Sequence, residues 1–444
     1  MSEYGSGTDG WLYGWALGYA AVGAASLLVP LYAIELGAGA FVVSLIAATA
    51  AFAGVPGAIL WGRLVTRTRR RRPFVLVALG LTAAVFLVLP FLASPWSVLV
   101  VNAVLWFVVA AAAPVLNIIV VEGFETDQWT RRFGLLNHYQ GYGWLAGLLA
   151  GGAWSSVAGP AFGLASVPAM RLFFVVSAVA TVGGFLLVLA RYPEASTISE
   201  QRFRRLTRRL RLNGGTAIRS ARGVPFGPVR VYWALRDIGG GSVLARLRTR
   251  YSGPLLRYLF GATVFFAGFS AFFGPLPAYL VDAGYATDEV FALFILNSAA
   301  AAAAYARAGA LAATRDSFSL QLGALGFRAV VFPIVAVSGA AVAPPFGLVV
   351  VGALFLAIGA SWAFIAVTAT TLVSRLAPES ARAEALGLYT AIGSLGGGIG
   401  SVLGGAAAEG IGYLVAFLAA GGLVVVGIGL VRSGARAENA AGAE

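Results

Sequence analysis

The sequence PLYAIELG, at Pro30–Gly37, recurs as PAYLVDAG at Pro277–Gly284. The two segments lie 247 residues apart, and they share the proline, the tyrosine, an acidic residue and the closing glycine. Each segment ends a long apolar run near the start of one half of the chain. The match therefore indicates an internal repeat, in which two related halves follow one another.

Glycines supply a second match between the halves, at an offset of 253 residues. In a membrane, small residues spaced by four let two helix backbones approach closely. Five glycines agree in register, because Gly134, Gly143, Gly147, Gly151 and Gly152 meet Gly387, Gly396, Gly400, Gly404 and Gly405. We therefore expect close helix packing at the last four glycines of each set.

The composition indicates a surface that faces lipid. Of the 444 residues, 59% are hydrophobic and 11% are charged, and the mean hydropathy is +0.85. A soluble domain has about 25% charged residues, and a membrane-spanning helix needs about 20 apolar residues. We therefore predict an all-α integral membrane protein with twelve transmembrane helices in two pseudo-symmetric six-helix bundles. The expected spans lie near 11–34, 41–65, 73–93, 96–121, 133–157, 171–190, 255–281, 288–312, 320–341, 345–373, 385–407 and 411–431.

Arginine indicates the orientation in the membrane. Connections after even-numbered spans carry nearly all of it, whereas the others hold mainly acidic residues such as Glu35, Asp282 and Glu409, with Arg171 as the exception. Because basic loops stay in the cytoplasm, we expect a multi-pass protein of the cytoplasmic membrane with both termini inside. The expected domains are an N-terminal six-helix bundle (1–190), a basic cytoplasmic loop (191–254) and a C-terminal six-helix bundle (255–444).

The net charge of +13 lies mostly in these connections, which indicates contact with anionic lipid headgroups and not with nucleic acid. Within the basic loop, Glu200–Leu212 fits either an amphipathic helix on the membrane surface or a disordered linker.

The chain has no cysteine and a single histidine, His138. This excludes disulfides, cysteine nucleophiles and metal sites built from cysteine or clustered histidine. The sequence places no carboxylate at the middle of a span and contains no nucleotide-binding loop. We therefore expect no catalytic residue, no metal and no cofactor, and a protein that is not an enzyme.

The connection between spans two and three reads GRLVTRTRRR at Gly62–Arg71. It resembles the G-x-L-x-D-R-x-G-R-R pattern of the major facilitator superfamily, and the arrangement of six spans, a basic loop and six spans resembles that family over nearly the whole chain. The resemblance implies a transporter in which this loop gates the cytoplasmic side. The gating-loop candidates are Gly62, Arg63, Arg67, Arg70 and Arg71.

This loop departs from the family pattern at two positions. Thr66 replaces the aspartate and Arg69 replaces the second glycine. The latch that the resemblance assigns to the aspartate is therefore lost, or it falls to Glu122 or Glu384. The other explanation of the arginines is that they only anchor the topology.

Span five contains a second motif, GWLAGLLAGG at Gly143–Gly152. It is similar to the g-x-x-x-G-P-x-x-G-G pattern of exporters in this family, with Leu148 in place of the proline. The resemblance implies export, although glycines at this spacing serve close packing in any helix pair.

Span five also holds a polar cluster that the matching part of span eleven lacks. Polar groups in lipid are costly and are usually functional, so we take these residues as candidate solute contacts. Histidine titrates near neutral pH, which makes His138 a candidate for carrying a coupling proton, together with Glu122. A purely structural histidine is the alternative. The cluster is Asn137, His138, Tyr139 and Gln140.

Spans one, four, seven and ten line the solute path in this family. The resemblance thus implies path residues there, and the aromatic, weakly charged set suits a neutral or lipophilic solute, with ordinary helix packing as the alternative for each ring. Arg328 lies inside span nine, and we expect its long side chain to reach back to the headgroups. The path candidates are Tyr19, Ser26, Trp106, Asn117, Phe265, Phe269 and Trp362.

Together these patterns predict a secondary active transporter (permease) that moves a small amphipathic or hydrophobic solute by alternating access, with export as the favoured direction. The alternatives are an importer or uniporter of a small organic solute, and a sensor that carries no flux. The expected partners are the solute, lipid headgroups and protons, and the chain is expected to be a monomer.

Overall fold

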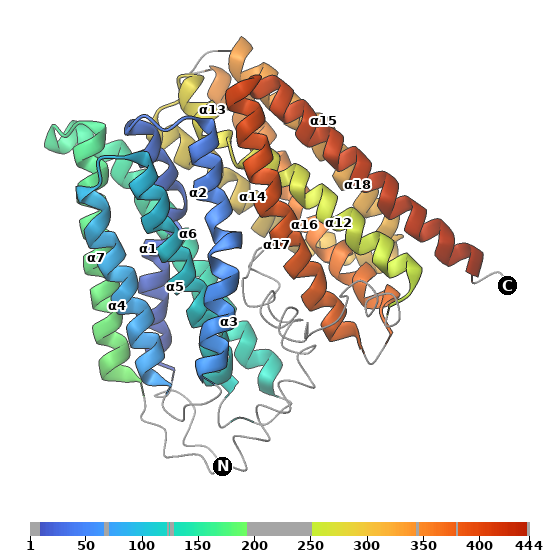
Figure 1. Ribbon diagram of the computed structural model, residues 1–444, viewed down its shortest axis with the longest axis horizontal. Coiled ribbons are helices and arrows are strands. Elements are labelled where there is room, and N and C mark those ends of the chain that lie inside the picture. The colour runs from blue at the N-terminus through green and yellow to red at the C-terminus, as the bar shows by residue number, and fades with distance from the viewer. Residues whose placement is uncertain are drawn as a thin grey trace. The chain divides into compact units, whose positions relative to one another are not determined.

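The computed structural model describes residues 9–65, 71–121, 124, 128–192, 251–342, 346–378 and 381–441. In that part of the chain every regular element is a helix, and twelve helical spans are long and apolar enough to cross a membrane (Figure 1). The predicted all-α fold with twelve transmembrane helices is therefore confirmed. The predicted basic loop, including Glu200–Leu212, lies almost wholly outside the described residues.

The chain divides into two compact units, Met1–Gly37 with Phe52–Tyr232, and Ala38–Ala51 with Trp233–Glu444. The helices of the first unit are α1 (Trp11–Glu35), α3 (Gly54–Val65), α4 (Arg72–Val88), η1 (Leu89–Phe91), α5 (Pro95–Val121), α6 (Trp129–Phe162) and α7 (Ser166–Arg191). Those of the second are α12 (Gly253–Phe273), α13 (Leu276–Asp282), α14 (Thr287–Thr314), α15 (Ser317–Ala341), α16 (Phe346–Leu376), α17 (Arg382–Gly410) and α18 (Tyr413–Ala441), and nearly all of α2 (Ala40–Phe52) belongs with them.

Two predicted spans are each divided into two helices. The second span breaks between α2 and α3, where Gly54 and Pro56 open the new helix, and the seventh breaks at Gly274 and Pro275, between α12 and α13. Proline lacks an N–H and crowds the preceding turn, so it starts helices more readily than it continues them.

The two units repeat one pattern of internal helix pairs. In the first unit α1 packs on α6 and α7, α4 packs on α5 and α7, and α3 packs on α5. In the second unit α12 packs on α17 and α18, α15 packs on α16 and α18, and α14 packs on α16. The order of the partners along the chain is the same in both units, as the sequence repeat predicts.

Glycine pairs mark one helix crossing in each unit. A Cβ atom on Gly14 of α1 would lie 2.6 Å from the carbonyl oxygen of Gly184 on α7. A Cβ atom on Gly261 of α12 would lie 3.1 Å from the carbonyl oxygen of Gly427 on α18. Gly14 and Gly261 are 247 residues apart, which is the offset of the Pro30–Gly37 repeat. Any larger side chain would force these helices apart.

The repeated tyrosines make equivalent contacts. Tyr32 Oη donates to the main-chain oxygen of Leu92, which follows η1, at 2.7 Å. Tyr279 Oη donates to the main-chain oxygen of Ala336 on α15 at 2.8 Å. Each tyrosine thus binds the first span of its half to the third.

The glycines predicted to pack closely lie against neighbouring helices at five positions. A Cβ atom on Gly147 of α6 would lie 1.9 Å from the main-chain oxygen of Ala20, and one on Gly400 of α17 would lie 2.0 Å from that of Ala267. Gly143, Gly396 and Gly404 approach α1 and α12 in the same way.

The remaining predicted glycines make different contacts. Gly405 faces the side chain of Ser44, and Ser401 Oγ donates to the main-chain oxygen of Ser44 at 2.8 Å. Gly151 and Gly152 offer carbonyl oxygens to the hydroxyl groups of serines four residues ahead.

Candidate functional site

A row of aromatic rings connects three helices of the first unit. The ring centre of Tyr19 on α1 lies 6.0 Å from that of Trp15 and 6.0 Å from that of Trp144 on α6. Trp144 lies 6.4 Å from Trp106 on α5. The predicted path residues Tyr19 and Trp106 are therefore linked through Trp144, which the sequence did not single out.

Two other path candidates of the first unit are polar. Ser26 Oγ donates to the main-chain oxygen of Gly23 at 2.7 Å, so its hydroxyl group is bonded within α1. Asn117 on α5 is partly buried. Neither joins the aromatic row through a described contact.

The polar residues of α6 make two kinds of contact, a hydrogen bond within the helix and contacts between aromatic rings. Asn137 Nδ2 donates to the main-chain oxygen of Phe133 at 2.9 Å. Tyr139 places its ring edge-on to Tyr13 of α1, with centres 5.0 Å apart, and Gln140 is partly buried. His138 is exposed, and its ring centre lies 4.1 Å from that of Tyr142, one turn along the helix.

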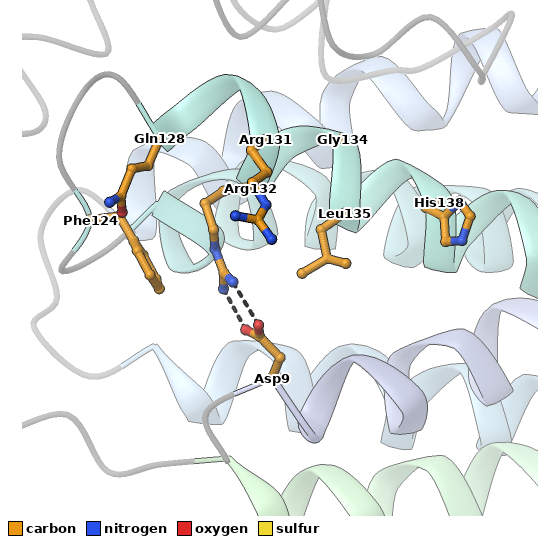
Figure 2. A pocket seen from close by; sticks show the side chains of 8 residues that line it. All are labelled: Asp9, Phe124, Gln128, Arg131, Arg132, Gly134, Leu135 and His138. Atoms are coloured by element: carbon orange, nitrogen blue, oxygen red, sulfur yellow. Dashed lines mark hydrogen bonds and ion pairs between the residues drawn. The ribbon is translucent and has the colours of Figure 1, made fainter. Parts of the chain in front are cut away.

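His138 lines a cavity of about 590 Å³ at the start of α6, with Asp9 of the first unit opposite (Figure 2). Figure 2 shows His138 farther along α6 than Arg131 and Arg132, whose side chains gather near Asp9. The full lining is Asp9, Phe124, Gln128, Arg131, Arg132, Gly134, Leu135 and His138.

An ion pair joins two sides of this cavity. Arg132 binds the Asp9 carboxylate through both of its Nη atoms, with Nη1 2.6 Å from Oδ2. Arg132 Nε donates to the main-chain oxygen of Val120 at 2.9 Å, and its Cζ lies 4.1 Å from the ring centre of Phe124. The carboxylate of Asp9 neutralises the guanidinium of Arg132. Because Arg131 also lines the cavity, the cavity keeps a net positive charge.

The second unit holds the other aromatic candidates in one cluster. Phe265 and Phe269 on α12 are buried, with ring centres 5.5 Å apart. Trp362 on α16 lies 6.4 Å from Phe269 and 6.3 Å from Phe266, a ring that the sequence did not single out. Trp362 is partly exposed at the edge of the cluster.

Arg328 lies in this same cluster, and the expectation that it reaches the headgroups is wrong. Only 2% of the residue is exposed. Its Nε donates to Ser361 Oγ and its Nη2 to the main-chain oxygen of Ile358, both at 2.9 Å. Its Cζ lies 4.5 Å from the ring centre of Phe269 and 5.4 Å from that of Trp362. Two acceptors on α16 and two ring faces hold the guanidinium inside the unit.

The structure describes only part of the predicted gating loop between α3 and α4. Arg67 and Arg70 are outside the described residues, and Glu122 is as well. Gly62 and Arg63 belong to the last turns of α3, where only the backbone is described. Arg71 is buried directly before α4. Within the described part of the chain, no three His, Asp or Glu side chains gather as a metal site would require.

The twelve apolar spans of the described residues, paired in the same way within each half, define a polytopic membrane protein built from two related halves. The Major Facilitator Superfamily model matches residues 12–378. The chain belongs to the major facilitator superfamily, and it is a membrane transporter.

Solved structures share this fold at low sequence identity. A point mutant of the nucleoside transporter NupG has a TM-score of 0.69 and 12% identity, covering 96% of this chain and 98% of that one. A bacterial homologue of the human lysosomal transporter Spinster, inward-facing and unoccupied, has a TM-score of 0.66 and 11% identity, with 96% of each chain covered. The human organic anion transporter MFSD10 (TETRAN) has a TM-score of 0.53 and 15% identity, covering 95% and 97%. No curated protein matches the sequence.

Proposed function

We propose that this transporter moves a small amphipathic solute by alternating access, and that it exports the solute from the cytoplasm. The observation that carries the solute class is the aromatic character of both units, on the helices that line the path in this family and on α6 beside them. Rings from α1, α5 and α6 form a connected row in the first unit, and rings from α12 and α16 form a cluster in the second.

Aromatic faces offer apolar area with little entropy loss on binding, and they suit a solute with an apolar body. A sugar or a polyphosphate would need many more polar contacts than these rings supply. The similar structures are named as carrying a nucleoside in one case and organic anions in another, so the fold itself leaves the solute class open.

The direction rests on the GWLAGLLAGG motif and on the helix that carries it. In α6 the motif glycines Gly143 and Gly147 lie against α1, one of the path helices. A helix that packs this closely can transmit a shift in α1 to the polar residues one turn away.

Flux of an amphipathic dye in proteoliposomes, with the dye loaded on either side, tests the direction of transport. Dye movement only from the cytoplasmic face of the protein to the opposite face supports export. Equal dye flux in both directions supports a uniporter, and no dye flux supports a sensor.

Proton coupling is assigned to His138, because it is exposed to a cavity that also holds Asp9, Arg131 and Arg132. We expect His138→Ala to abolish transport driven by a pH gradient while leaving solute counterflow intact, since exchange needs no net proton movement. Tyr142→Phe is the matched control, because it keeps a ring beside position 138 and leaves the imidazole in place. An equal loss of gradient-driven transport and counterflow in His138→Ala would reject the coupling role.

A further inference from the structure

Arg328 presents an unbalanced charge inside the second unit. A guanidinium stays protonated at any pH that a protein meets. Placing it at the centre of a membrane span costs about 2.5–3.5 kcal/mol on a translocon scale. The main-chain oxygen of Ile358, the hydroxyl group of Ser361 and the ring faces of Phe269 and Trp362 soften this cost, but none of them carries a negative charge.

The described carboxylates do not supply the missing charge. In the second unit they lie at helix ends and in connections, at Asp282, Asp288, Glu289, Asp316 and Glu409. Buried charges in proteins are normally paired, and no described carboxylate supplies the partner that the position of this arginine demands.

The geometry around Arg328 suits an anion with an apolar body. Its Nη1 donates no hydrogen bond within the described part of the chain, while Nε and Nη2 are held by α16. A guanidinium fixed in this way presents donors that match the oxygens of a carboxylate or sulfonate. Trp362 is only partly buried, so the cluster has an accessible surface on the side of this ring.

We propose that Arg328 binds the negative group of a monovalent organic anion, whose apolar body packs against Phe269 and Trp362. The solute is then the counter-ion of the arginine. This inference rests on the proposed function, since it narrows an amphipathic solute to an amphipathic anion. It predicts that the transporter discriminates by the sign of the charge, because a cation at this position would meet like charge with no described carboxylate to compensate.

The test compares two probes with the same aromatic body and permanent charges of opposite sign, 2-naphthalenesulfonate and (2-naphthylmethyl)trimethylammonium. The full-length protein is assayed for thermal stabilisation by each probe in detergent and for uptake of each radiolabelled probe in proteoliposomes. We expect the sulfonate to stabilise the protein and to be transported, and the ammonium compound to do neither.

Variants locate the effect at Arg328. We expect Arg328→Met to weaken sulfonate binding about 10- to 100-fold, the loss of one charge-assisted contact, and Arg328→Lys to retain part of it. Arg307→Met removes an exposed arginine on α14 and is the matched control, which should bind like the wild type. If Arg328→Met does not fold, Arg328→Lys and the comparison of the two probes on the wild type decide the question.

Four outcomes overturn the proposal. The first two are equal binding of both probes by the wild type and binding of the cation alone. The third is an unchanged affinity for the sulfonate in Arg328→Met. The fourth is that chloride stabilises the protein as much as the sulfonate does, and that this stabilisation depends on Arg328. If neither probe binds or moves, the proposed function itself fails for aromatic solutes, which is a separate result.

Discussion

Asp316 shows how one side chain starts a membrane span. It is the N-cap of α15, and its carboxylate accepts hydrogen bonds from the main-chain N–H of Ser319 at 2.8 Å and from Ser319 Oγ at 2.8 Å. Burial alone would raise the pKa of Asp316. The hydrogen bonds from Ser319 and Phe318, together with the positive charge of Arg375, outweigh burial and hold the pKa below its ordinary value. The charged form is therefore the one that caps the helix.

Replacing this cap tests its contribution to stability. We expect Asp316→Ala to lower stability by about 0.5–2 kcal/mol, measured by thermal unfolding at pH 7, and Asp316→Asn to lose less because the amide oxygen still accepts. A carboxylate with a lowered pKa stabilises the fold fully above its ordinary pKa of about 3.9 and loses that effect as the pH falls through the lowered value. The gap between wild type and Asp316→Ala should thus narrow in acid. A gap that widens in acid would contradict this account.

At this scale the sequence could predict residue types but not their partners. The polarity of α6 pointed to His138 and Tyr139 because polar groups are rare in such a span. No sequence pattern predicts the ion pair between Asp9 and Arg132, which are 123 positions apart. Arg328 was visible as a lone arginine, yet only folding places α16 and the ring of Phe269 close enough to hold it.

At the scale of elements, glycine faces decide which helices touch. Gly147 on α6 sits so close to Ala20 of α1 that a methyl group has no space there, whereas Gly141 on the same helix has nothing within 4 Å of a built Cβ atom. One helix therefore carries a packed glycine and a free one, less than two turns apart.

This contrast gives a matched pair of substitutions. We expect Gly147→Ala to destabilise the protein by about 1–3 kcal/mol, the usual cost of overpacking. Gly141→Ala should leave stability unchanged or raise it by up to about 1 kcal/mol, because alanine favours a helix over glycine. Thermal unfolding of both variants in one detergent is the measurement. Equal melting temperatures would show that α1 and α6 can separate without cost.

The spacing of these glycines made the contact predictable, but the breaks in spans two and seven were not predicted. Hydropathy averages over a whole span, so Gly54 and Pro275 were absorbed into continuous apolar runs. Proline at other positions, such as Pro30, lies inside an unbroken helix. The break depends on how neighbouring helices satisfy the freed main-chain groups, and a window of sequence does not contain them.

At the scale of the whole molecule, the arginine distribution predicts which ends of the helices face the cytoplasm. The two ends of α14 illustrate it, since Asp288 and Glu289 lie in its first turn and Arg315 follows its last residue. Orientation in a membrane stays a prediction, because a helix bundle has the same internal contacts in either direction.

The absence of cysteine makes this orientation easy to test. We expect Ala286→Cys, at the exposed start of α14, to react with an impermeant maleimide added to intact cells. Arg315→Cys, at the exposed end of the same helix, should react only after the cells are opened. The reverse pattern would invert the topology, and the wild type, which has no cysteine, serves as the blank.

The paired crossings at Gly14 with Gly184 and at Gly261 with Gly427 also carry historical information. If each half had acquired its crossing independently, there would be no reason for Gly14 and Gly261 to share the spacing of the tyrosine segment. A common ancestor of six helices would already have needed both the crossing and the tyrosine, before its gene was duplicated and fused. Side chains that differ between the halves, such as His138 and Arg328, then reflect changes in one of the halves after the duplication.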